Sequence, residues 1–134
     1  MLNFISDISH YDIVLNLATQ AKRSLWIGTA DIKDLYVIQG RVEKPFLGIL
    51  AELIGRGVEI RLIHAKEPGP NFREDFDRYP RLAKMLERVM CPRVHFKIIV
   101  IDQKICYVGS ANLTGAGMGM KSPHRRNFEA GIIT

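Results

Sequence analysis

The sequence has few of the residues that cross-link or interrupt a chain. It contains 2 cysteines, 6 prolines and 11 glycines in 134 residues. Cys91 and Cys106 are too few for a disulfide framework and lack the CxxC spacing of a zinc site, so we expect both to be reduced and to fill the core. With 47% hydrophobic and 25% charged residues, the composition excludes disordered and collagen-like chains. For this length we expect a single globular domain over residues 1–134.

Long hydrophobic runs are also absent. The most apolar stretch, residues 94–108, is interrupted by Lys97, Asp102 and Lys104. The longest apolar run within it, residues 98–101, is much shorter than the roughly 18 apolar residues that span a bilayer. The first ten residues contain Asp7 and no Lys or Arg, unlike the basic start of a signal peptide. We therefore expect no membrane insertion and a cytoplasmic location.

Acidic residues are outnumbered by basic ones only in the second half of the chain. The whole sequence has 19 Lys and Arg against 14 Asp and Glu, a net charge of +5. Residues 1–67 hold 8 of each sign, whereas residues 68–134 hold 11 basic and 6 acidic side chains. A local positive potential attracts phosphate-bearing ligands, so an anionic partner is one interpretation. Ordinary solubilising charge is the other.

Hydrophobic periodicity predicts helices that alternate with strands. Apolar residues spaced three to four apart predict helices over residues 11–21, 46–54 and 80–91. The third of these has an apolar face made of Leu82, Met85, Leu86 and Val89. The many glycines in residues 109–123 indicate a loop.

Short apolar stretches predict strands over residues 25–29, 58–64 and 128–134. Residues 94–102 and 105–108 have the pattern of a hairpin, with a polar break at Gln103 and Lys104. This order of elements predicts an α/β fold with a mixed, mostly parallel β-sheet flanked by helices on both faces.

Two basic side chains stand close together on the strand that is expected to begin at residue 94. Side chains two residues apart on a strand point to the same face, so His95 and Lys97 project together. Lysine is almost never fully buried without a partner, so this face must open onto a cleft or contact an acid. Asp102 lies seven positions after His95 and therefore on the opposite face, where we expect it to pin the hairpin.

Polar side chains also follow the hairpin. Ser110 and Asn112 come directly after Gly109 and offer hydroxyl and amide donors to phosphate oxygens, beside small residues that let the backbone approach a ligand. Glu129 is a carboxylate on an otherwise apolar strand. Such a group is able to accept the ring N–H of a histidine and so determine its tautomer.

The spacing of these residues resembles the HKD signature of the phospholipase D superfamily, H-x-K-x4-D-x6-G-S-x-N. The sequence matches it at every position, with His95, Lys97, Asp102, Gly109, Ser110 and Asn112. The stretch around Glu129 is similar to the one in which that superfamily places its supporting glutamate. The resemblance implies the superfamily fold for the whole chain.

It also implies a phosphodiesterase that works through a covalent phosphohistidine, without a metal or other cofactor. In this interpretation His95 attacks phosphorus and Glu129 orients its imidazole. The non-bridging oxygens are held by Lys97, Ser110 and Asn112. The reaction needs a second histidine as general acid, and the sequence has one copy of the motif. The resemblance therefore implies a homodimer that shares one active site, as in the small bacterial endonucleases of the superfamily.

Three functions remain open at this point. Nucleic acid as the substrate agrees with the basic second half of the chain. A lipid phosphodiesterase is the second possibility, with Met118 and Met120 of the glycine-rich loop against a lipid surface. The third is a catalytically silent module for nucleic-acid binding or assembly.

Three further residues are candidates for substrate contact. Arg125 and Arg126 are suited to a phosphate backbone, and a solvated loop explains them equally well. His64 ends a predicted strand, where open α/β sheets tend to bind ligands, although an ordinary histidine at a loop edge is the simpler interpretation.

Overall fold

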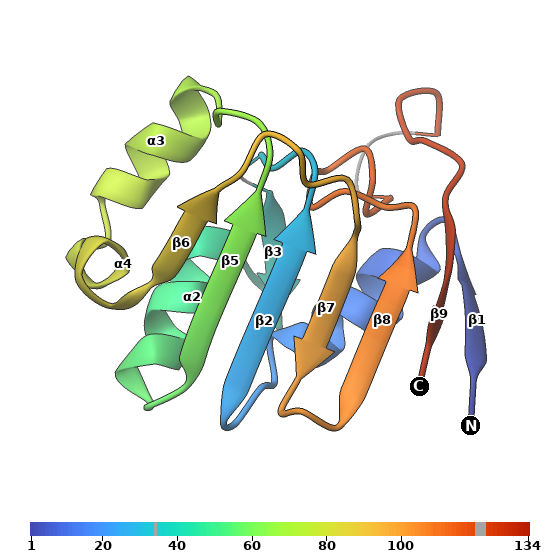
Figure 1. The fold of residues 1–134 in the computed structure, drawn as a ribbon, viewed down its shortest axis with the longest axis horizontal. Coiled ribbons are helices and arrows are strands. Elements are labelled where there is room, and N and C mark those ends of the chain that lie inside the picture. The colour runs from blue at the N-terminus through green and yellow to red at the C-terminus, as the bar shows by residue number, and fades with distance from the viewer. Residues whose placement is uncertain (34, 120–122) are drawn as a thin grey trace.

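One large sheet and one separate hairpin organise the computed structural model, which describes residues 1–33, 35–119 and 123–134. The sheet has seven strands in the order β1-β9-β8-β7-β2-β5-β6, and β3-β4 form the hairpin (Figure 1). The strands are β1 (Asn3–Ser6), β2 (Ser24–Thr29), β3 (Tyr36–Gln39), β4 (Val42–Pro45), β5 (Glu59–His64), β6 (Glu87–Met90), β7 (Ile98–Ile101), β8 (Ile105–Gly109) and β9 (Ala130–Ile133). The helices are the π-helix η1 (His10–Leu15), α1 (Asn16–Ala18), α2 (Phe46–Gly55), α3 (Pro70–Asp77) and α4 (Pro80–Met85).

The sheet is mixed, as predicted, but most of its pairings are antiparallel. β5 pairs in parallel with β2 and with β6, because α2 and then α3 and α4 form the crossovers between these strands. The pairs β2–β7, β7–β8, β8–β9 and β9–β1 are antiparallel. The prediction of a mostly parallel sheet is therefore wrong, since a hairpin and the two chain ends supply the other half of the sheet.

The helices cover one face of the sheet. α1 and α2 lie behind the strands in Figure 1, and α3 and α4 pack on α2 beside the β6 edge. The core lies between these layers and includes Leu25 and Ile27 of β2, Leu62 of β5 and Leu50 and Leu53 of α2. Every described helix falls short of the length and hydrophobicity that a membrane-spanning helix requires.

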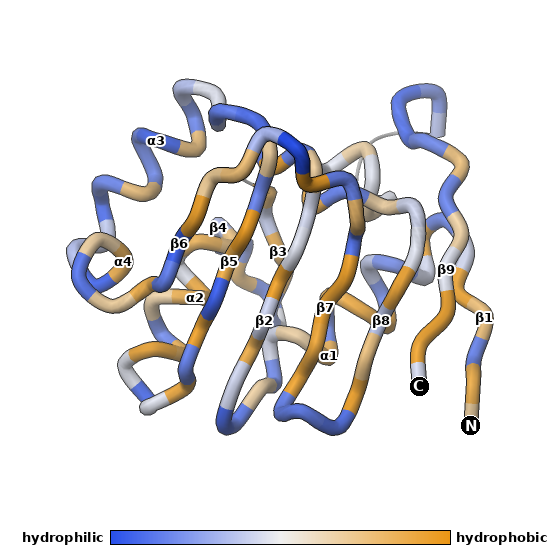
Figure 2. The backbone as a smooth tube through the Cα atoms, viewed as in Figure 1, coloured by the Kyte–Doolittle hydropathy of each residue, from blue (hydrophilic) through white to orange (hydrophobic). Residues whose placement is uncertain are grey.

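No described helix covers the opposite face, so the prediction of helices on both faces is wrong. Side chains alternate along each strand, and every second residue points to this face. Val89, Phe96 and Val108 are each about half exposed on it, at 57%, 52% and 47%. Figure 2 shows apolar residues along the central strands that carry this face. The order of strands and helices predicted cover on both faces, but this order does not determine on which face each helix packs.

The predicted helix over residues 80–91 is divided into two elements. α4 ends at Met85, and β6 continues as a strand that pairs with β5, with Arg61 opposite Glu87. Leu82 is buried, whereas Met85 is exposed. The helical spacing of the apolar residues is overridden here by backbone hydrogen bonds to the free edge of β5.

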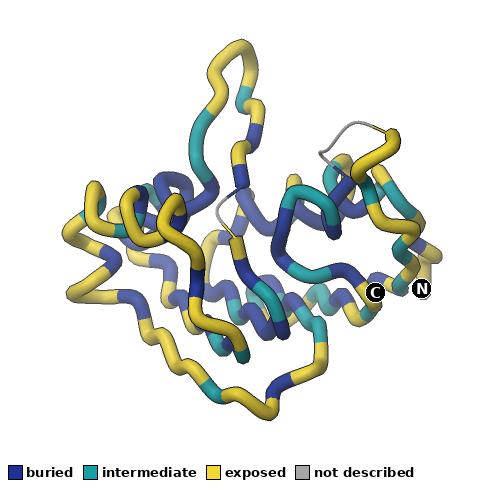
Figure 3. The backbone as a smooth tube through the Cα atoms, turned by 90° about the horizontal axis from the view of Figure 1, so that it is seen from above, coloured by how far each residue is buried: buried dark blue, intermediate teal, exposed yellow. Residues whose placement is uncertain are grey.

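The predictions for the centre of the fold are confirmed by β2, α2 and β5. The predicted first helix is present as η1 and α1, which end earlier, at Ala18. Sequence reasoning missed β1, α3 and the β3-β4 hairpin. Seen from above, this hairpin projects away from the sheet on the helix-covered side (Figure 3).

Candidate active site

The predicted site lies at the edge of the sheet where β7 begins and β8 ends (Figure 1). β7 starts at Ile98, so His95 and Lys97 precede the strand instead of lying within it. The backbone N–H of Gly109 donates a hydrogen bond to the carbonyl oxygen of Lys97, over 3.2 Å. This bond extends the β7–β8 ladder by one step and holds the His95 and Ser110 segments side by side.

The residue between the two basic side chains packs against β2. Phe96 lies on the uncovered face, where its ring fills the space above Gly28. His95 and Lys97 flank Phe96 in the segment that leads into β7. His95 is exposed and Lys97 is half-buried. The ammonium group of Lys97 therefore avoids the cost of full burial.

Ser110 connects the end of β8 to the beginning of β9. Its hydroxyl donates to Oε1 of Glu129 over 3.1 Å and accepts the backbone N–H of Ala130 over 3.0 Å. The backbone N–H of Ser110 donates to the carbonyl oxygen of Ala130 over 2.9 Å. Ser110 and Glu129, which are 19 positions apart in the sequence, are therefore joined by a direct hydrogen bond between their side chains.

Asn112 is held at the end of β2. Its Oδ1 accepts the backbone N–H of Asp31 over 3.0 Å. The hydroxyl of Thr29 accepts the N–H of Leu113 over 3.0 Å and donates to the carbonyl oxygen of Asp31 over 2.6 Å. Because the carboxamide oxygen is engaged, the Nδ2 amide is the group of Asn112 that remains suited to donate to an anionic ligand.

Asp7 clamps the backbone of Glu129, and sequence reasoning missed it. The N–H of Asp7 donates to the carbonyl oxygen of Glu129, and Oδ1 of Asp7 accepts the N–H of Glu129, both over 3.0 Å. Asp7 has a φ of 47°, a left-handed conformation that few non-glycine residues adopt. The two residues are 122 positions apart, and nothing in the local sequence signals the contact.

Tyr107 lies buried beneath these residues, with 1% of its surface exposed. Burial, reinforced by the negative charge of Glu129, raises the pKa of its hydroxyl to about 12, although the N–H of Ala111 acts in the opposite direction. The ring of His10 packs edge-on against it, with 5.3 Å between ring centroids. Tyr107 is thus a neutral support for the strand ends.

Asp102 lies at the other end of the hairpin and away from the site. It occupies the turn between β7 and β8, where its carboxylate accepts the backbone N–H groups of Lys22, Arg23 and Ser24. Burial alone would raise its pKa, but these hydrogen bonds outweigh burial and the pKa is lowered. This placement gives Asp102 a role in the structure of the hairpin.

The structure does not bring His64 into the site. His64 is fully buried, its Nδ1 lies 2.9 Å from the carbonyl oxygen of Lys66, and its Nε2 lies 3.1 Å from Nη1 of Arg88. Burial lowers the pKa of its imidazole, and the charge of Arg88 acts in the same direction, against the hydrogen bond to Lys66. A neutral His64 that donates from Nδ1 and accepts at Nε2 satisfies both partners.

The remaining predicted residues lie in the loop before β9. Arg125 is exposed, and Arg126 is half-buried beside Phe128 and Asn127. Met118 is buried, so its side chain does not contribute to a lipid-facing surface, and Met120 lies outside the described residues.

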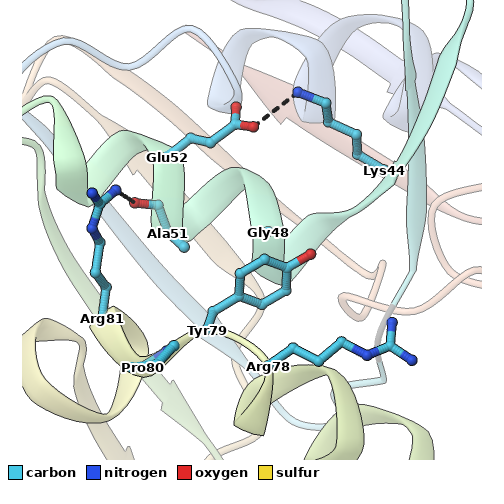
Figure 4. A pocket seen from close by; sticks show the side chains of 8 residues that line it. All are labelled: Lys44, Gly48, Ala51, Glu52, Arg78, Tyr79, Pro80 and Arg81. Atoms are coloured by element: carbon cyan, nitrogen blue, oxygen red, sulfur yellow. Dashed lines mark hydrogen bonds and ion pairs between the residues drawn. The ribbon is translucent and has the colours of Figure 1, made fainter.

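A separate pocket of about 340 Å³ lies between α2 and α4 and contains none of the predicted site residues (Figure 4). Its charged side chains already have partners: Lys44 binds Glu52 over 2.8 Å, Arg78 binds Asp75 over 2.8 Å, and Arg81 donates to the carbonyl oxygen of Ala51 over 3.5 Å. The ring of Tyr79 lies against Gly48, where a side chain would collide with it. These contacts join β4 and α4 to α2.

The chain is similar to known proteins over nearly its whole length. The profile of the family described as "Cardiolipin synthase, PLD-like domain" matches residues 14–134. Phospholipase D Z of Dictyostelium discoideum is 28% identical over 127 aligned residues, which cover 84% of this chain and 29% of that protein. The chain therefore spans less than a third of this curated relative.

Two solved structures have a similar fold. One is Nuc, a phospholipase D family member from Salmonella typhimurium, with a TM-score of 0.65 and 18% identity; the match covers 99% of this chain and 81% of Nuc. The other is NucT from Helicobacter pylori, with a TM-score of 0.64 and 14% identity; the match covers 99% of this chain and 85% of NucT.

Proposed function

The chain belongs to the phospholipase D superfamily, and from this premise we propose that it is a phosphodiesterase domain that cleaves DNA or RNA. The observation that carries the proposal is the hydrogen bond from Gly109 to Lys97. It aligns the segment that holds the nucleophile with the segment that holds Ser110 and Asn112, whose donors suit the oxygens of a phosphodiester.

In the proposed reaction an imidazole nitrogen of His95 attacks phosphorus in line. A P–N bond forms, the P–O bond to the leaving alcohol breaks, and the leaving oxygen takes a proton from a second histidine. Water then attacks the phosphohistidine and gives its proton to that second histidine. The P–N bond breaks, which regenerates His95 and releases a phosphomonoester.

The surrounding groups support these steps by position and charge. The Lys97 ammonium and the Nδ2 amide of Asn112 stabilise the negative charge on the non-bridging oxygens. Glu129 uses Oε1 for the Ser110 hydroxyl, which leaves Oε2 to accept an imidazole N–H. We propose that Glu129 fixes the tautomer of the nucleophile in this way.

The second histidine comes from a second copy of the chain in this proposal. The other histidines do not suit the role, since His64 and His10 are fully buried and His124 lies outside the motif. A two-fold dimer presents the same surface of each copy to the other and so supplies the second His95. Nucleic acid is favoured over lipid because the net charge is +5 and Met118 is buried.

The proposal is tested by assaying single-stranded DNA, RNA and phospholipid vesicles with wild type, His95→Ala and, as a matched control, His124→Ala. We expect cleavage of nucleic acid that persists in EDTA, its loss in His95→Ala alone, and an acid-labile phosphoenzyme in wild type. Cleavage of phospholipid alone, or unchanged activity of folded His95→Ala, would overturn it.

The shared site is tested by mixing the inactive variant with wild type. If one active site needs both copies of His95, added His95→Ala exchanges into mixed dimers and lowers activity more steeply than dilution does. A strictly proportional fall, or an active monomer in sedimentation experiments, excludes the shared site.

A further inference from the structure

A pocket of about 450 Å³ opens beside Asn112, between the β3-β4 hairpin and the loop that follows β8. Two chain segments that run together contribute to its lining, one with Asp31 and Lys33 and the other with Asn112 and Thr114. Ile32 and Leu113 form a parallel bridge, and the N–H of Lys33 donates to the carbonyl oxygen of Leu113 over 3.1 Å. The pocket is in the size range of small-molecule sites and shares Asn112 with the proposed phosphate site.

The lining combines an aromatic ring with acidic, basic and amide side chains. The polar and aromatic residues around the pocket include Asp31, Lys33, Tyr36, Glu43, Asn112 and Asn127. The described lining residues include two carboxylates, of Asp31 and Glu43, and one ammonium, of Lys33. The pocket is therefore poorly suited to a run of phosphates and well suited to a neutral group that donates hydrogen bonds.

Tyr36 supplies a flat apolar surface whose orientation is held in place. Its hydroxyl donates to Oδ2 of Asp75 over 3.2 Å, and Asp75 is almost fully buried and paired with Arg78 over 2.8 Å. The residue nevertheless remains 40% exposed. An anchored and accessible aromatic ring is the feature on which proteins stack unpaired bases.

Resting on the proposed function, we propose that this pocket binds the nucleobase next to the scissile phosphate. The base stacks on Tyr36, and its amino group donates to the carboxylates of Asp31 or Glu43. A base reaches such a pocket only when it is unpaired and unstacked. The pocket therefore gives the enzyme a preference for single strands over duplexes.

The test compares two single-stranded oligonucleotides of equal length, one normal and one with abasic residues on both sides of the cleaved phosphate. The variants are Tyr36→Leu, Tyr36→Phe, which keeps the ring, and Ile38→Ala, a control at an exposed position of the same strand that does not line the pocket. We expect Tyr36→Leu to raise KM for the normal strand at least about tenfold. Tyr36→Phe keeps the ring but loses the hydrogen bond to Asp75, so it should raise KM less than Tyr36→Leu does. Ile38→Ala should remain close to wild type.

The abasic strand separates loss of the pocket from loss of catalysis. Wild type and Tyr36→Leu should cleave the abasic strand with the same KM, because this strand has no base beside the cleaved phosphate to stack on residue 36. An unchanged KM of Tyr36→Leu for the normal strand overturns the base pocket while the nuclease stands. A defect of Tyr36→Leu on phospholipid vesicles alone would assign the pocket to a lipid headgroup and overturn it as well. If wild type cleaves neither strand, the proposed function itself fails.

Discussion

Oδ1 of Asp102 lies 2.6 Å from the backbone nitrogen of Arg23, across 79 positions of sequence. Asp102 and Gln103 both have positive φ, at 53° and 56°, and form a two-residue turn closed by the N–H of Lys104 and the carbonyl oxygen of Ile101. Such a turn is normally built from Asn and Gly. The carboxylate compensates by fixing this turn to the segment before β2.

We predict that Asp102→Ala lowers the free energy of unfolding by about 1 to 3 kcal/mol, since it removes several hydrogen bonds to a charged acceptor. Urea unfolding at pH 7 measures this. Because the pKa of Asp102 is lowered in the folded state, its stabilisation is present above the unfolded pKa of about 3.9 and is lost as the pH falls through the folded value. The difference between wild type and variant should therefore shrink at low pH. A folded Asp102→Ala protein that keeps its stability but loses turnover would place Asp102 in the active site.

Gly109 has no room for a side chain. An added Cβ would lie 2.7 Å from the carbonyl oxygen of Ala130 and would also collide with the hydroxyl of Tyr107. We predict that Gly109→Ala costs about 1 to 3 kcal/mol of stability and displaces the Ser110 segment, with loss of activity. Gly69→Ala is the matched control, because nothing lies within 4 Å of that position. The double variant Gly109→Ala/Tyr107→Phe should remain impaired, since the carbonyl oxygen of Ala130 is unchanged. Equal stability of the two alanine variants in urea would contradict this account.

The local parts of the site were predictable from the sequence, and its long-range supports were not. The spacing of His95, Lys97, Ser110 and Asn112 is determined by a hairpin, so the register that brings Gly109 against Lys97 follows from the chain itself. The clamp of Asp7 on Glu129 depends instead on β1 pairing with β9. No local pattern at either end specifies that pairing.

The same division applies to the fold. α2 and β5 have clear periodicities and were predicted nearly to their ends. β6 was predicted as part of a helix because Leu82 and Leu86 have helical spacing, and its strand conformation comes from pairing with β5. His64 was considered for the substrate cleft, but its contact with Arg88 of β6 depends on that same pairing.

His64 should make stability depend on pH in a defined direction. Its pKa is lowered in the folded state, so below about pH 6.5 the unfolded chain binds a proton that the folded chain does not. Stability therefore falls as the pH decreases from about 7 toward the folded pKa. Unfolding experiments at pH 8 and pH 5 should show that the stability advantage of wild type over His64→Gln shrinks at pH 5, whereas exposed His124→Gln tracks wild type. A constant advantage across this range would show that His64 is not held neutral.

Asp7 should act as a positioning residue for Glu129. Asp7→Ala removes the acceptor for the N–H of Glu129, while Asp7→Asn keeps an oxygen at the same place and also tolerates the left-handed backbone at a φ of 47°. We predict that Asp7→Ala lowers kcat about tenfold or more, because the carboxylate of Glu129 moves relative to His95. It should lower stability by about 1 to 3 kcal/mol, because one hydrogen bond is lost and alanine is disfavoured in the left-handed backbone conformation. Asp7→Asn should restore most of kcat, and the fall of kcat in Asp7→Ala should exceed the fall in its folded fraction under the assay conditions, which a purely structural defect would not explain. If folded Asp7→Ala turns over at the wild-type rate, the position of Glu129 does not depend on this clamp.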